Sequence, residues 1–203
     1  MKKAHHFSGL FIALFAGLHL FNHLLSLGGI QQHLNSMAAM RQVYRHPILE
    51  TALLLAVVLQ ITTGLRLWGR LRQKAHPFFV RLQLWSGLYL AMFLLIHVGA
   101  VLAGRWVFQL DTNFYFAAVG INTFPFNLFF IPYYLLAVLS VFAHLAAVHA
   151  QKMKRSWGTL TPKGQAQMLL ALGAIVAVLI LYGITGGFQG VEVPEEYGVM
   201  VGK

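Results

Sequence analysis

Histidines inside apolar stretches are the residues of this sequence whose type and position could do chemistry. Four lie within such stretches and a fifth lies at the end of one: His19, His23, His97, His144 and His149. Ionisable side chains are rare inside a bilayer and usually mark a function, although a lone histidine can also make an interhelical hydrogen bond. Two neutral imidazoles from different helices at one depth are the axial ligands of a six-coordinate haem iron. The histidines therefore indicate a haem-binding site.

Other metal and hydrolytic chemistries have less support. The chain has no cysteine, which excludes thiolate metal sites and Cys-ligated iron–sulfur clusters on this chain. A zinc site is a weaker alternative, because His144 and His149 share a helix face poorly and the sequence has no HEXXH motif. A GxSxG motif is also absent from the sequence. The other histidines lie at the ends of apolar stretches or between them, where we expect interfacial or solvated side chains: His5, His6, His33, His46 and His76.

Five long apolar segments must position these histidines. Of the 203 residues, 58% are hydrophobic and 10% are charged, which is too little charge to cover the surface of a soluble protein. A membrane-spanning helix needs roughly 20 mainly apolar residues, and unpaired backbone in lipid is too costly for other structures. The qualifying segments are residues 7–27, 47–67, 83–103, 126–149 and 167–187. We therefore expect an all-α integral membrane bundle of five transmembrane helices, with one membrane domain over residues 1–203.

The distribution of lysine and arginine predicts the orientation of the bundle. If the N-terminus is cytoplasmic, most of the 15 basic residues fall on the cytoplasmic side. The basic residues on the external side are then Arg41, Arg45, Arg105 and Lys203. Short cytoplasmic loops carry the excess of positive charge in membrane proteins, so we expect a cytoplasmic N-terminus and an external C-terminus. The same rule explains the net charge of +10, and nucleic acid is not an expected partner. The first segment lacks a small-residue cleavage site and is expected to be a retained helix.

Helical rise places two of the histidines at one level. At about 1.5 Å per residue, His19 lies about 18 Å from the inner end of the first helix, and His97 lies about 21 Å from that of the third. His144 lies about 8 Å from the inner end of the fourth helix, which runs the opposite way. We expect His19 and His97 to pair in the outer half, with Gly17 and Gly99 letting a porphyrin approach the backbone. A hydrogen bond between the two histidines, direct or through water, is the structural alternative.

Short motifs along the chain are similar to those of a known family. They are HHFSG at 5–9, HLFNH at 19–23, LE at 49–50, FLLIHV at 93–98 and VLSVFAH at 138–144. In this order, the motifs resemble the five-helix, haem-containing cytochrome b membrane anchor of succinate:quinone oxidoreductases and fumarate reductases, of the single-subunit type. The similarity covers nearly the whole chain in length, number of spans, topology and histidine placement.

The resemblance implies two stacked haem b groups and suggests their iron ligands. The outer pair carries over to His19 and His97, and the fourth-helix ligand of the inner haem carries over to His144. The second helix departs from the family, because Gln60 stands where the family has a histidine. Three outcomes stay open: one haem, a second five-coordinate haem on His144, or a second haem with a ligand that the alignment does not identify. We expect one haem, held by His19 and His97.

The resemblance also implies a function within a larger complex. A flavoprotein and an iron–sulfur subunit on the cytoplasmic side would oxidise succinate or reduce fumarate, and this chain would pass electrons between them and a membrane quinone through haem. The location implied is the inner (cytoplasmic) membrane. A quinone site near the external face would suit menaquinone. Neither the direction of catalysis nor the oligomeric state follows from the sequence.

Two further residues carry over from the family. Glu50 is implied in quinol proton exchange; a snorkelling carboxylate or a partner of Arg45 or Arg41 is the alternative. Ser8 stands at the usual start of the first helix and is a candidate cofactor-binding residue, with a helix N-cap as its alternative.

Two other functions fit the same features. The first is a haem b electron carrier of another quinone-linked dehydrogenase. The second is a haem-free protein, either a transporter or a membrane anchor. A transporter should show matched helix breaks at mid-membrane, which this sequence lacks, so that the haem-free anchor is the stronger form.

Overall fold

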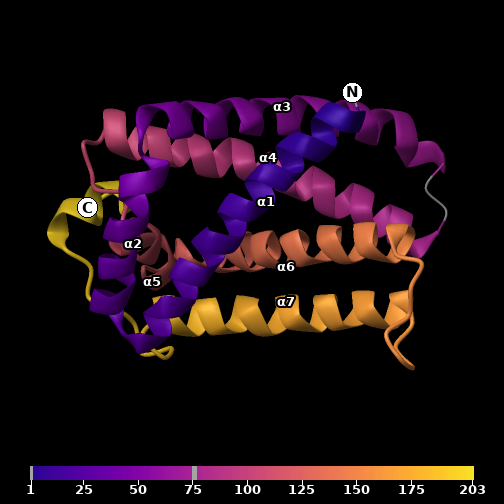
Figure 1. Ribbon diagram of the computed structural model, residues 1–203. Helices are drawn as coiled ribbons and strands as arrows, with labels where there is room; N and C mark the ends of the chain where they lie inside the picture. The colour runs from indigo at the N-terminus through magenta and orange to yellow at the C-terminus, as the bar shows by residue number, and fades with distance from the viewer. Residues whose placement is uncertain (1, 75–76) are drawn as a thin grey trace.

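The computed structural model describes residues 2–74 and 77–203, and five long helices dominate it (Figure 1). All five are long and apolar enough to cross a membrane: α1 Lys2–Leu24, α3 Pro47–Leu71, α4 Phe78–Trp106, α6 Asn127–Lys152 and α7 Pro162–Ile184. Shorter helices connect or follow them: η1 Leu25–Gly28, α2 Ile30–Tyr44, η2 Arg72–Lys74, α5 Phe114–Asn122 and η3 Glu195–Val201. Within the described residues there is no strand. The chain is an all-α, multi-pass membrane bundle.

The five long helices form a ring in which each packs against its two neighbours. The order around the ring is α1, α3, α4, α6 and α7, and α7 returns to contact α1. α1 crosses the others obliquely (Figure 1). Because α1 and α4 are not neighbours in this ring, side chains from these two helices can meet only across its interior.

Apolar stripes on the helices face outward, towards lipid. On α1, Leu10, Leu14, Leu18 and Phe21 are exposed and recur at helical spacing, whereas Ser8 and Asn22 on the opposite side are buried. This is the pattern of a membrane helix, whose apolar side chains contact lipid and whose polar side chains face other helices. Ser8 and Asn22 of α1 therefore face the inside of the ring.

One end of the ring is covered by short elements. Figure 1 shows α2 lying across that end, with α5 and the C-terminal segment beside it. The largest buried side chains lie in these short elements and include Phe114 of α5, Tyr197 of η3 and His33 of α2. We call this covered end the outer end, following the orientation expected from the basic residues, and the opposite end the inner end.

Candidate functional site

His19 of α1 and His97 of α4 meet across the interior of the ring. Their ring centroids lie 6.2 Å apart, with an angle of 62° between the ring planes. Two imidazoles that bind one metal from opposite sides, each with its nitrogen about 2 Å away, have centroids about 6 Å apart. Phe93 stacks on His97 with a centroid distance of 4.9 Å, which fixes the plane of this imidazole. The structure thus brings together the two residues expected to form the outer pair.

Two more histidines extend this pair towards the outer end. His23 Nε2 lies 3.2 Å from Nε2 of His19, and His23 Nδ1 lies 3.4 Å from Nε2 of His33. Asn22 Nδ2 donates to the same His33 nitrogen at 3.2 Å. An amide NH₂ group can only donate, so His33 Nε2 is an acceptor. Its contact with His23 then makes His23 Nδ1 a donor and leaves the lone pair of His23 on Nε2.

His23 therefore competes with His19 as a metal ligand. A metal-ligating histidine almost always donates its second ring N–H to a fixed acceptor, because this holds the ring and raises its basicity. His23 has such an acceptor in His33, whereas His19 has no second partner among the described residues. His23 was noted in the sequence as lying within a span, but its spacing alone does not show that a residue from α2 would orient it.

The expectation of an interfacial or solvated side chain is wrong for His33. It is 0% exposed, and it packs against Phe114 with a ring-centroid distance of 5.3 Å. Burial lowers its pKa to about 4, with smaller contributions from the nearby charges of His19 and Arg41. Its position in α2 could have signalled this burial, because residues 30, 33, 34 and 37 form one face of a helix and three of them are large and apolar.

Gly17 and Gly99 do not lie beside the candidate haem ligands. Two residues along a helix correspond to a rotation of about 200°, so each glycine lies almost opposite its neighbouring histidine. Both are exposed, on the outward faces of α1 and α4, and a Cβ added at either would meet nothing within 4 Å. The expectation that these glycines would admit a porphyrin is therefore wrong.

A second polar cluster joins α1 to α3 nearer the inner end. Ser8 Oγ donates to Gln60 Oε1 at 2.7 Å and to the Ala4 carbonyl at 3.0 Å. Gln60 Nε2 lies 3.3 Å from His5 Nε2, and His5 Nδ1 lies 2.9 Å from Thr63 Oγ1. Ser8 is inside α1, so it is not a helix N-cap. Gln60 acts as a hydrogen-bonding bridge between helices, and His5 is one of its partners rather than a solvated residue.

His144 is held from α4. Its Nδ1 lies 3.1 Å from the Gln83 carbonyl and 3.3 Å from Ser86 Oγ. A Cβ at Gly87 would lie 3.1 Å from Cε1 of His144, so a larger residue there would require the imidazole to shift slightly. The Nδ1–H bond to a carbonyl leaves Nε2 as an acceptor, which is the tautomer of a ligating histidine.

The remaining histidines lie away from the pair formed by His19 and His97. His149 Nε2 lies 2.7 Å from Gln165 Oε1, so His149 links α6 to α7. His6 and His46 are exposed, as expected, and His76 lies outside the described residues. Among the described residues, no group of three or more His, Asp or Glu side chains is arranged to hold a metal ion. Haem iron needs only one or two such ligands, because the porphyrin supplies four.

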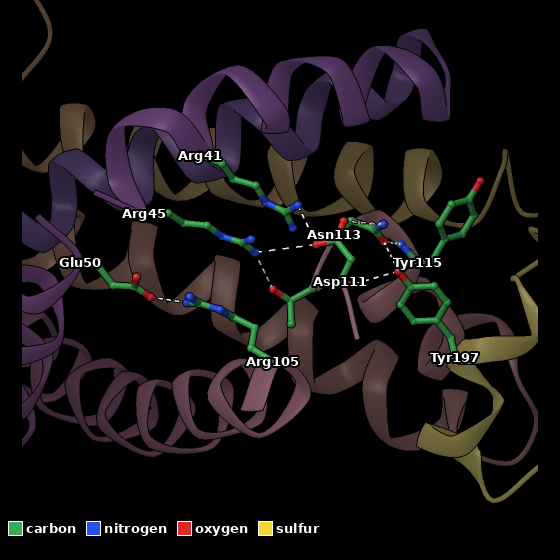
Figure 2. Close-up of polar contacts among 9 residues, drawn as sticks. Arg41, Arg45, Glu50, Arg105, Asp111, Asn113, Tyr115 and Tyr197 are labelled. Carbon is green, nitrogen blue, oxygen red and sulfur yellow. Dashed lines mark hydrogen bonds and ion pairs between the residues drawn. The ribbon is translucent and has the colours of Figure 1, made fainter. Parts of the chain in front are cut away.

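Ion pairs join α2, α3, α4 and the segment after α4 at the outer end of the bundle (Figure 2). Glu50 at the start of α3 pairs with Arg105 at the end of α4. Asp111, in the segment that follows α4, accepts from Arg41 at 2.7 Å and lies 3.9 Å from Arg45. The partner of Glu50 is thus Arg105, whereas the sequence had suggested Arg41 or Arg45. Burial lowers the pKa of Arg45, and the positive charges of Arg41 and Arg105 lower it further.

An apolar cavity borders His19. Its volume is about 310 Å³, and side chains from α1, α2 and α3 line it. His19 and Asn22 supply polar groups, whereas residues such as Phe15, Met40 and Leu53 supply apolar walls. The cavity is therefore suited to a flat apolar molecule with a few polar atoms.

Comparison with protein-family models, curated proteins and solved structures found no match to this chain. Functional assignment therefore rests on the residues of the site and their geometry.

Proposed function

We propose that this chain is a haem b-binding membrane subunit that passes electrons between a cytoplasmic dehydrogenase and membrane quinone. The dehydrogenase would consist of the flavoprotein and iron–sulfur subunits of a succinate:quinone oxidoreductase or fumarate reductase, and the membrane would be the inner (cytoplasmic) one. The observation that carries the proposal is the pair of imidazoles of His19 and His97, 6.2 Å apart across the interior of the ring. Haem, when bound, supplies one-electron chemistry.

The donor set fits one haem. His97 and His19 would hold its iron, as the sequence predicts. His23 is the competing second ligand, because its Nδ1 is already bonded to His33. If His19 binds iron through Nε2, its hydrogen bond to His23 opens, and His23 stays oriented by His33. The role of His33 in either case is to hold an imidazole in one plane and one tautomer.

A second haem is not part of the proposal. His144 has the tautomer of a ligand, but the residue at the expected ligand position of α3 is Gln60, which bonds to Ser8 and His5. Glutamine is a poor ligand of haem iron, and this one already has two partners. His144 is then explained by its contacts with Ser86 and Gln83, as a polar link between α4 and α6.

Quinone chemistry would take place near the outer end. The cavity beside His19 has the apolar walls that a quinone ring needs and lies beside the proposed haem ligands, and menaquinone suits a site on this side. Glu50 is 25% exposed and is held by Arg105. Proton exchange by Glu50 therefore requires this pair to open. Electrons would pass between this site and the inner end, where the basic loops would help an iron–sulfur subunit to dock.

A haem-free membrane anchor is the second candidate function. The hydrogen bonds from His19 through His23 and His33 to Asn22 give these three imidazoles at least one partner each without any ligand, whereas His33 Nδ1 has none among the described residues. Interhelical polar contacts of this kind also stabilise membrane bundles. The two candidates differ in one observable, the presence of haem.

A visible spectrum of the purified full-length chain tests the proposal. We expect a b-type reduced-minus-oxidised spectrum with about one haem per chain. His97→Ala should abolish the haem, whereas His46→Ala, at an exposed histidine, should retain it. Of His19→Ala and His23→Ala, the variant that loses the haem identifies the second ligand. Wild-type protein without haem, expressed with adequate haem supply, would overturn the proposal and leave the haem-free anchor.

A further inference from the structure

The outer end of the bundle carries an excess of partly buried positive charge. Arg41 and Arg45 of α2 and Arg105 of α4 converge there on two carboxylates, Asp111 and Glu50 (Figure 2). Arg105 is matched by Glu50, so that Arg41 and Arg45 share the single charge of Asp111. One positive charge of this group is therefore without a counter-charge among the described residues.

The guanidinium of Arg41 is held in place but uses only one of its edges. Its Nη1 donates to Asp111 at 2.7 Å. Its Nε and Nη2 atoms are buried and have no hydrogen-bond partner among the described residues. These two N–H groups lie on one edge of the planar group and point the same way, which is the geometry that binds a carboxylate or a phosphate through two parallel hydrogen bonds. Buried donors in folded proteins nearly always have a partner.

Arg41 does not line the cavity beside His19, but its charge is near enough to His33 to help lower the pKa of that histidine. The neighbours of Arg41 in α2, Met40 and Tyr44, line the cavity that His19 borders. Tyr44 also packs on Phe15 of α1, with a ring-centroid distance of 5.4 Å. Further along the same face of α2 is His33, the residue that holds His23. The turn of α2 that carries Arg41 thus packs against the turn of α1 that precedes His19.

We propose that the Nε–Nη2 edge of Arg41 binds a carboxylate of the haem, one of its propionates. This inference rests on the proposed function. Haem carries both carboxylates on one edge of an apolar ring, so a haem inside a bilayer needs cations at one end of its pocket. Arg41 provides a bidentate donor there, and Arg45 adds a second positive charge. The phosphate of a lipid is the less favoured occupant, because the Arg41 side chain is only 15% exposed and a headgroup would approach from outside α2.

Haem dimethyl ester, which lacks the propionate charges, provides the test. Apo protein in detergent or nanodiscs is titrated with haem and with the ester, for the wild type and for Arg41→Gln. We expect the substitution to weaken haem binding about tenfold or more, as for loss of a charge-assisted contact, and to leave ester binding nearly unchanged. Such non-additivity identifies a direct interaction between the two altered groups.

Three further variants separate this contact from general damage to the outer end. Asp111→Asn breaks the same ion pair but keeps the Nε–Nη2 edge of Arg41, so it should not change the ratio of ester affinity to haem affinity. Arg41→Lys keeps the positive charge but lacks the two parallel N–H donors, and it should give an intermediate ratio of ester affinity to haem affinity. Arg70→Gln, at an exposed arginine towards the inner end, should change neither affinity. If Arg41→Gln does not fold, the affinities of Arg41→Lys for haem and for the ester are compared with those of the wild type instead.

The outcomes distinguish failure of this inference from failure of the proposed function. Wild type that binds neither haem nor ester shows that the proposed function is wrong. Wild type that binds haem, with Arg41→Gln weakening haem and ester equally or neither of them, overturns the propionate contact alone. Loss of a co-purified phospholipid from Arg41→Gln in native mass spectrometry, with unchanged haem affinity, would also overturn it and assign the edge to a lipid phosphate.

Discussion

Burial decides what His33 can do at the scale of a single residue. It is fully buried, and its pKa is lowered to about 4, first by burial and then by neighbouring positive charge. The side chain is therefore neutral at pH 7 and acts as a hydrogen-bond acceptor for His23 and Asn22. The neutral ring of His33 can therefore accept the hydrogen bond that orients the imidazole of His23.

This lowered pKa predicts a loss of stability in mild acid. The folded pKa of His33 is below the unfolded value of about 6.5, so the unfolded chain takes up the proton first as the pH falls. The stabilisation is complete above about pH 6.5 and is lost progressively towards pH 4. Between pH 7 and pH 5, we expect the contribution of this residue to the free energy of unfolding to fall by about 2 kcal/mol.

Thermal unfolding in detergent at the two pH values checks the effect. His33→Gln keeps an amide near His23 but cannot be protonated, so its unfolding should depend less on pH than that of the wild type. His46→Gln, at an exposed position, is the control and should behave as wild type. Equal pH dependence of unfolding in all three proteins would show that His33 is not the cause of the loss of stability in acid.

Close packing of small residues governs the contact between α6 and α7 at the scale of elements. Gly173 of α7 lies against Phe142 of α6, and a Cβ at this glycine would overlap the phenylalanine side chain. Without a hydrophobic force between helices in lipid, close approach of this kind contributes much of the packing energy. Gly17, by contrast, faces outward with free space around it.

The two glycines should therefore respond in opposite ways to alanine. Gly173→Ala should destabilise the bundle by about 1–3 kcal/mol, as overpacking does elsewhere. Gly17→Ala should have no packing cost and should gain up to about 1 kcal/mol in helix propensity. Unfolding of both variants in one detergent, followed by circular dichroism, measures the difference. A Gly173→Ala variant as stable as Gly17→Ala would show that α6 and α7 do not pack as described.

The whole molecule is a ring of five helices with one covered end. Its ends differ in construction, since α2, α5 and η3 cover one end (Figure 1) and a short 3-10 turn, η2, occurs in the α3–α4 connection at the other. The basic residues favour the uncovered end on the cytoplasmic side. The proposed haem ligands, the Arg41 edge and Glu50 would then all belong to the half of the bundle nearer the external face.

Labelling of single cysteines tests this orientation in cells. The natural chain has no cysteine, so each introduced thiol is the only one. Gln189→Cys follows α7, and Lys154→Cys lies between α6 and α7; both positions are exposed. A membrane-impermeant maleimide should label residue 189 in intact cells and residue 154 only after lysis. The reverse result would invert the orientation and place the proposed haem near the cytoplasmic face.

Hydrophobic length was enough to predict the five-helix bundle from the sequence. Each expected segment overlaps one long helix, because a stretch of about 20 apolar residues in lipid satisfies its own backbone hydrogen bonds only as an α-helix. The pairing of His19 with His97 was also predictable, because helical rise alone sets depth. Rotation about each helix axis was less well predicted, and Gly17 and Gly99 face outward for this reason.

Only the tertiary structure decided which residues meet. His33 and Arg41 lie in a segment that the sequence marks as a polar outer connection, and they enter the site because α2 folds back across the end of the ring. Gln60 became a bridge to Ser8 and His5 because α3 packs against α1. Contacts of this kind depend on which helices are neighbours and how they are rotated, and these are set by packing over the whole bundle rather than by any single segment.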